Sequence, residues 1–194
     1  SAPRRGRPAA ASRADVLERA LDRYLRGQRI DVQALAAELG LGRTTIYRWF
    51  GSRERLVGEV LVLAAEPIFD HACARATGLG AKGLLDTFDR INRELAAAPA
   101  LRAFLAYERD ALRIITSSSG VVQPSMVAKV TGCIEDEVRR GTFVPAVEPD
   151  VLAYAIVRLA EAFLYNDTMT GIRGEVDRLR QVEAVLLGLP AESA

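Results

Sequence analysis

The sequence contains few of the residues on which metal sites, disulfides and nucleophilic catalysis depend. Its two cysteines, Cys73 and Cys133, belong to no CxxC pattern, and His71 is the only histidine. Isolated cysteines are typically small buried apolar side chains in a reducing compartment, and a lone histidine is more often structural than a ligand contact. We therefore expect no disulfide, no metal centre and no cofactor.

Catalytic motifs are absent as well. The chain has no GxSxG elbow, no glycine-rich phosphate loop and no Cys/His nucleophile arrangement. Glu108 and Asp110 are two residues apart, so on a helix they face different sides and cannot form a general acid–base pair. An enzyme is thus a minor alternative, and we expect that the protein is not one.

The sequence also lacks a long apolar run. The most apolar stretch, residues 56–69, is interrupted by Glu59, Glu66 and Pro67, so it does not predict a membrane span. The arginines near the start imitate the basic part of an export signal, but residues 9–12 lead into charge rather than into an apolar segment. We expect a cytoplasmic protein with no membrane partner.

Aromatic residues are scarce, at 6%, and Ala and Leu dominate over β-branched residues. This composition favours helices over sheets. A hydrophobic content of 49% suffices for a substantial core, and 194 residues suit one large or two small domains.

Charge is distributed unevenly along the chain. The first 55 residues hold twelve arginines against six acidic residues, whereas the remainder is acidic, although the whole chain carries only +1. A basic segment on an acidic body suggests an anionic partner for that segment alone, with a solvated arginine-rich surface as the alternative.

Helical periodicity recurs along the chain, and we found no convincing strand and no internal repeat. Ser12, Asp31 and Ser52 are expected N-caps, and Gly40 and Gly51 are expected helix ends. Pro67 is predicted to kink the fourth helix. The sequence therefore predicts an all-α fold of roughly nine helices, with later helices over residues 82–97, 99–115, 123–140, 149–168 and 175–187.

Residues 32–50 read VQALAAELGLGRTTIYRWF, which fits a helix-turn-helix. Two helices that cross steeply need a small residue at their contact and a turn residue that tolerates positive φ, and Ala36 and Gly40 fill these positions. Leu41, Ile46 and Phe50 would then face inward. An ordinary corner between two helices is the alternative interpretation of this pattern.

Together with the helix before it and the residues after it, this motif makes the segment from Val16 to Leu56 resemble the TetR family of bacterial regulators. The resemblance is carried by Thr45, Tyr47 and Phe50 in T-x-Y-x-x-F and by the following string GSRERL. Gln123-Pro124 and residues 153–168 resemble the QsdR-like subgroup of that family. The family implies a helical head that contains the helix-turn-helix and a larger helical ligand-binding and dimerisation domain. We accordingly expect a flexible basic arm over residues 1–11, a DNA-binding domain over 12–54 and the larger domain over 55–190.

The resemblance implies a double-stranded DNA operator as partner, contacted by the third helix. Thr44 and Thr45 match positions at the start of the recognition helix, and Tyr47 matches a frequent phosphate or base contact. Arg53 stands where the family usually has Lys, near a phosphate, and keeps the charge. The candidate DNA-binding residues are Arg4, Arg5, Arg7, Arg43, Thr44, Thr45, Tyr47, Arg48, Trp49 and Arg53.

The arm before the first helix, residues 4–8, reads RRGRP and resembles an AT-hook core. An extended segment of this kind fits a narrow minor groove, where the negative potential attracts arginine. A disordered tail that adds only diffuse charge is the alternative.

The resemblance further implies a homodimer in which the last two long helices pair with their counterparts. The candidate interface residues are small or apolar: Ala155, Leu159, Ala162, Phe163, Val182, Val185 and Leu186. The alternative is that these side chains face the core of their own protomer.

A cavity for an unknown small-molecule effector is expected between the fourth helix and the three that follow it. By helical position its candidate residues are Phe69, Phe88, Asn92, Phe104, Tyr107, Glu108 and Met126, each of which could equally be plain core. The resemblance implies that effector binding moves the fourth helix, with Pro67 as the expected flex point, and changes the separation of the two recognition helices.

The predicted function is a homodimeric, ligand-responsive repressor that binds a specific operator. A transcriptional activator of the same family is the main alternative. A nonspecific DNA-binding protein is a weaker one, because the acidic body argues against it.

Overall fold

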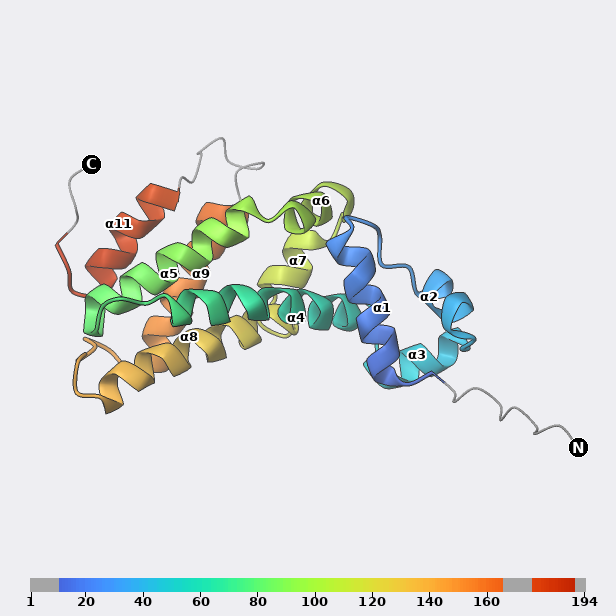
Figure 1. The fold of residues 1–194 in the computed structure, drawn as a ribbon, viewed down its shortest axis with the longest axis horizontal. Helices are drawn as coiled ribbons and strands as arrows, with labels where there is room; N and C mark the ends of the chain where they lie inside the picture. The colour runs from blue at the N-terminus through green and yellow to red at the C-terminus, as the bar shows by residue number, and fades with distance from the viewer. Residues whose placement is uncertain (1–10, 166–175, 191–194) are drawn as a thin grey trace, which may run out of the picture.

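The computed structural model describes residues 11–165 and 176–190, and these contain ten helices and no strand. The molecule is elongated, with a head at one end and a larger body at the other (Figure 1). The helices are α1 (Arg13–Leu25), α2 (Val32–Leu39), α3 (Arg43–Phe50), α4 (Arg53–Ala74), α5 (Gly80–Ala97), α6 (Pro99–Tyr107), α7 (Ala111–Thr116), α8 (Val122–Arg139), α9 (Pro149–Tyr165) and α11 (Val176–Leu186).

Side-chain caps define where the head helices begin, as predicted. Ser12 and Asp15 form a reciprocal capping box at the start of α1. The Asp31 carboxylate accepts from the Ala34 N–H at 2.9 Å, and the Ser52 hydroxyl accepts from the Arg55 N–H at 3.1 Å. Each cap satisfies a backbone donor that the first helical turn leaves without a partner.

The turn between α2 and α3 depends on Gly40, whose φ of 64° and ψ of 30° are left-handed. The Leu41 N–H then donates to the Ala36 carbonyl at 2.8 Å, which closes the end of α2. Ala36, Ile46 and Phe50 are buried, and Leu41 packs against the same core. The predicted helix-turn-helix is therefore present, with its apolar side chains facing inward.

Two hydrophobic clusters fill the interior, and α4 contributes to both. Leu56, Val57 and Val60 pack with α1–α3, α6 and α7, whereas Phe69 and Ala72 pack with α5, α8, α9 and α11. The first cluster thus continues across the predicted domain boundary between residues 54 and 55, because α6 and α7 share the core of the head. The head is packed onto the body, not joined to it by a bare linker.

The predicted single helix over residues 99–115 is wrong, because the structure has two helices there. Glu108 has an extended conformation, with φ −94° and ψ 112°, which ends α6. Its carboxylate is bonded to Arg53, and the Tyr107 carbonyl accepts from Arg29. These contacts with the head stabilise a corner at which α7 takes a new direction.

Two other expectations concern single residues. Cys73, expected to be buried, is exposed, and Cys133 is half-buried. Pro67 lies inside α4, which is assigned as one helix from Arg53 to Ala74, so the predicted kink stays a prediction. Within the described residues, no helix is both long enough and apolar enough to cross a membrane.

The conformation of Gly40 leads to a testable difference between two glycines. We expect Gly40→Ala to lower the free energy of unfolding by about 1 kcal/mol, because an L-residue is strained at positive φ. Gly132 lies inside α8 with open space around an added Cβ, so Gly132→Ala should raise it by about 0.5–1 kcal/mol. Urea denaturation of both variants measures this, and a shift of the same sign in both would contradict it.

Candidate DNA interface and ligand cavity

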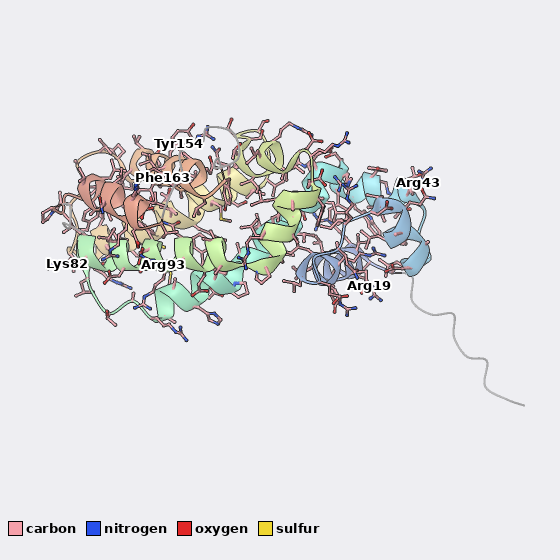
Figure 2. All side chains as sticks on the ribbon, turned by 90° about the horizontal axis from the view of Figure 1, so that it is seen from above. Arg19, Arg43, Lys82, Arg93, Tyr154 and Phe163 are labelled. Carbon is pink, nitrogen blue, oxygen red and sulfur yellow. The ribbon has the colours of Figure 1, made fainter. Side chains whose placement is uncertain are left out.

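The recognition helix α3 presents two different faces. Ile46 and Phe50 are buried in the head, whereas Arg43, Thr44, Tyr47 and Arg48 are exposed. Figure 2 shows Arg43 on the head, at the opposite end of the molecule from Lys82 and Phe163. The exposed face therefore lies where a DNA duplex could reach it without meeting the body.

Thr45 and Trp49 are less accessible than their neighbours on α3. Both are half-buried, and Trp49 packs against the hydrophobic core of the head. Trp49 therefore has a structural contact in addition to its predicted one with DNA.

The arginines of the head differ in whether they are already paired. Within the part of the chain that the structure describes, Arg43 and Arg48 form no ion pair and no hydrogen bond through their side chains. Their charges are thus free to meet phosphates. Other arginines of the head already form ion pairs within the chain: Arg13 with Glu59, Arg19 with Asp22 and Glu38, Arg23 with Glu38, and Arg26 with Asp22.

Arg53 connects the head to the α6–α7 corner. Its Nη2 atom lies 2.7 Å from Glu108 Oε2, and its Nε donates to the Ile30 carbonyl at 3.1 Å. The Tyr107 hydroxyl donates to the Gln28 carbonyl at 3.0 Å, which adds a second link to the same loop of the head. Burial is the main reason that the pKa of Tyr107 is raised, with the negative Glu108 adding to it.

A cavity of about 330 Å³ lies inside the body and reaches the head. Its wall includes Leu61, Ile68 and Phe69 of α4, and also Tyr24 and Leu25 of α1. A molecule in the cavity would therefore touch a head helix directly. The sequence did not suggest this contact, since Tyr24 and Leu25 continue the apolar face of α1.

Four of the residues predicted for the cavity lie in its wall, namely Phe69, Phe88, Asn92 and Met126. Phe104, Tyr107 and Glu108 do not line this cavity. Phe104 is buried against the rings of Tyr24 and Tyr107, at centroid distances of 6.2 and 5.9 Å. The corner after α6 turns Tyr107 and Glu108 toward the head.

Two carboxyl groups in the cavity wall were missed, Glu161 on α9 and Glu183 on α11. Glu183 is fully buried and accepts from Asn92 Nδ2 at 3.0 Å. Burial raises its pKa from 4.5 to about 7, and Asn92 and Arg180 oppose that rise. The available signal was its spacing, because Glu183 falls four residues after Leu179 and four before Leu187, where apolar side chains would face the core.

The predicted dimer residues remain accessible on α9 and α11. Ala162, Val182 and Val185 are exposed, and Ala155, Leu159, Phe163 and Leu186 are partly exposed. Tyr154, on the same helix as Phe163, is also exposed, at 48% (Figure 2). None of the seven is buried in its own protomer. The predicted DNA contacts of Arg4, Arg5 and Arg7 lie outside the described residues.

A helix-turn-helix head on a body that is helical in its described residues, with a cavity between the two, defines the class of helix-turn-helix regulators. Residues 79–188 match the family model described as the tetracyclin repressor-like C-terminal domain. The chain therefore belongs to the TetR family of DNA-binding transcription regulators, as its sequence predicted.

Solved structures agree with this assignment. The transcriptional repressor QsdR of R. erythropolis, from the TetR family, matches with a TM-score of 0.87 and 28% identity, over 94% of this chain and 97% of that one. The TetR-family repressor AlkX of Dietzia sp. strain DQ12-45-1b has the same fold, with a TM-score of 0.63 at 18% identity over 93% and 96%. No curated protein sequence matches this chain significantly.

The burial of Glu183 predicts how stability depends on pH. Because the pKa of Glu183 is raised in the folded state, its contribution to the free energy of unfolding is most favourable below pH 4.5. That stability is lost as pH rises through about 7. The shift corresponds to about 3 kcal/mol. We expect Glu183→Gln to reduce this loss, whereas Glu135→Gln, at an exposed position, leaves it unchanged. Denaturation between pH 4.5 and 8 tests this, and equal pH slopes in the two variants would refute it.

Proposed function

We propose that the protein is a homodimeric repressor that binds a pseudo-palindromic operator and is released by a small molecule bound in its cavity. The observation that carries this proposal is the exposed face of α3, whose Arg43 and Arg48 are unpaired among the described residues. The other parts follow from the cavity and from the accessible faces of α9 and α11.

In the proposed complex α3 lies in the major groove. Arg43 and Arg48 contact phosphates, while Thr44, Thr45 and Tyr47 reach base edges or phosphates. Trp49 lies beside the sugar–phosphate backbone while it packs on the head.

In this proposal the Arg53 side chain contacts DNA while it keeps its hydrogen bonds within the protein. Its Nε and Nη2 atoms are bonded to Ile30 and Glu108, which leaves Nη1 for a phosphate. The arm with Arg4, Arg5 and Arg7 adds minor-groove contacts.

The dimer places two recognition helices on one duplex. One helix reads only a few base pairs, and two half-sites one helical turn apart require centres about 34–36 Å apart. We propose that the exposed side chains of α9 and α11 pack on their counterparts in a four-helix arrangement.

Release requires that the ligand binds the DNA-incompetent arrangement more tightly than the competent one, since equal affinities would shift nothing. The cavity wall contains parts of both α1 and α4, so a ligand can displace the head relative to the body. The Arg53–Glu108 pair and the Tyr107–Gln28 bond link the α6–α7 corner to the same head. These contacts support coupling between cavity and head. They do not distinguish repression from activation. We propose repression because the structurally similar QsdR of the TetR family is a repressor.

The DNA interface is tested by the salt dependence of binding. We expect Arg48→Ala to weaken binding to the duplex upstream of the protein's own gene. The slope of log K against log salt should become shallower by about 0.9 for each phosphate that the protein no longer neutralises, or about 1.8 for a dimer. Arg26→Ala removes the same charge from a residue that Asp22 already neutralises, so it serves as control. Equal slopes for the two variants, measured by fluorescence anisotropy, would contradict the proposed interface.

The dimer face is tested by placing a charge on it. Val185 is 58% exposed on α11, and Val144 is 90% exposed in the segment between α8 and α9. We expect Val185→Glu to produce monomers, because two carboxylates would be buried in the interface without partners. Val144→Glu should remain dimeric. Sedimentation velocity decides, and a dimeric Val185→Glu variant would exclude this face.

A further inference from the structure

The cavity wall has an unusual balance of polar groups. Most of its residues are apolar, and its polar side chains among the described residues come from Tyr24, Asn92, Glu161, Tyr165 and Glu183. Two of these are carboxyl groups, and no Lys, Arg or His of the described ranges lines the cavity. A wall with two acidic groups and no basic one disfavours an anionic ligand.

The polar part of the wall centres on Glu183. Its Oε1 atom accepts a hydrogen bond from Asn92 Nδ2 at 3.0 Å, but its Oε2 atom has no partner among the described residues. A buried polar atom without a partner is unfavourable, and more so when the group is charged. A molecule that gave Oε2 a donor would remove this cost.

Charged residues of α5 and α11 act on Glu183, and the other carboxyl group of the cavity wall lies on α9. Asp89 of α5 adds negative charge, while Arg180 of α11 offsets it only in part, because Arg180 lies 3.0 Å from Asp86 and 3.6 Å from Asp89. On α9, one oxygen of Glu161 accepts from Arg158 Nη1 at 2.9 Å. Asp89 is also paired with Arg93, and of the two charges that act on Glu183 that of Asp89 has the larger effect, so the neighbouring charges do not favour ionisation of Glu183 in the ligand-free protein.

From this geometry we propose that the cavity selects a small apolar molecule that carries a protonated amine, whose N–H groups donate to Glu183. The inference rests on the proposed function, since it names the class of effector that the cavity takes. An ammonium group has three donors and no acceptor, so it can satisfy Oε2 and neutralise the carboxylate together.

The rest of the wall fits such a molecule. Phe69, Phe88 and Tyr165 provide aromatic surface for an apolar body or for a cation over a ring. A volume of about 330 Å³ lies at the small end of ligand sites, so the body must be small. Near neutral pH the carboxyl of Glu183 is close to its pKa of about 7, and a bound cation favours its ionised form.

Four probes with one skeleton test the proposal: 4-phenylbutylamine, 4-phenylbutan-1-ol, the methyl ether of that alcohol, and 4-phenylbutanoate. Isothermal titration of the full chain without DNA at pH 7.5 gives each affinity. We expect the amine to bind about tenfold more tightly than the alcohol, since charge-assisted hydrogen bonds are roughly twice as strong as neutral ones. The ether should bind more weakly still, and the carboxylate weakest.

Variants assign the preference to Glu183. Glu183→Gln should bring the ratio of amine to alcohol affinity close to one, whereas Glu135→Gln on the exposed side of α8 should leave it unchanged. If Glu183→Gln does not fold, the pH dependence of binding to the wild-type protein tests the proposal instead. Between pH 6 and 8 its affinity for the amine should rise as Glu183 ionises, while its affinity for the alcohol should not.

Several outcomes would overturn the proposal: ether or carboxylate affinity equal to that of the amine, failure of all four probes to bind, or an unchanged preference in Glu183→Gln. Release from DNA is measured separately by adding the amine to the protein–duplex complex. An amine that binds as described but leaves DNA binding intact would refute the proposed release, not the ligand class.

Discussion

The structure depends on the packing of one helix, α4, into two hydrophobic cores at once. Its first half buries Leu56, Val57 and Val60 with the head, and its second half buries Phe69 and Ala72 with the body. Near its start Gly58 lies so close to Val121 that an added Cβ would be 2.9 Å from the Val121 Cβ. Because close-packed interiors do not deform gradually, a displacement of one half of α4 must be shared by the other.

The α6–α7 corner is the second connection between head and body. Besides the core that α6 and α7 share with the head, it includes polar contacts, in which Arg53 reaches Glu108 and Tyr107 reaches the loop after α1. Such contacts are directional and short-ranged, so they specify one orientation of the head, whereas the burial of apolar surface is not directional. A change in head orientation would therefore break hydrogen bonds at the corner before it exposed much of the core.

The local features of the fold could be predicted from sequence, and the features set by contacts distant in sequence could not. Ser12, Asp31, Ser52 and Gly40 act within a few residues of themselves, and each was predicted correctly. The end of α6 at Glu108 was missed because residues 100–115 hold no glycine or proline, and the break depends on an arginine 55 residues away. The spacing of Glu183 from Leu179 and Leu187 indicated that it is buried, but its hydrogen bond to Asn92, 91 residues away, could not be predicted from sequence. Among the proposed DNA contacts, periodicity separated the exposed face of α3 from its buried face, but it did not reveal which arginines are neutralised.

Glu183 connects the stability of the body to its proposed ligand. An apolar residue at this position would pack α11 on α5 without the cost of burying a carboxyl group. A carboxyl group whose Oε2 lacks a partner among the described residues weakens this packing in the ligand-free protein, and a donor in the cavity would strengthen it. Binding would therefore tighten the contact between α5 and α11. Since other walls of the same cavity belong to α1 and α4, that tightening would also change the packing where the head joins the body. A residue that is unfavourable for stability alone is thus suited to coupling ligand binding to the position of the head.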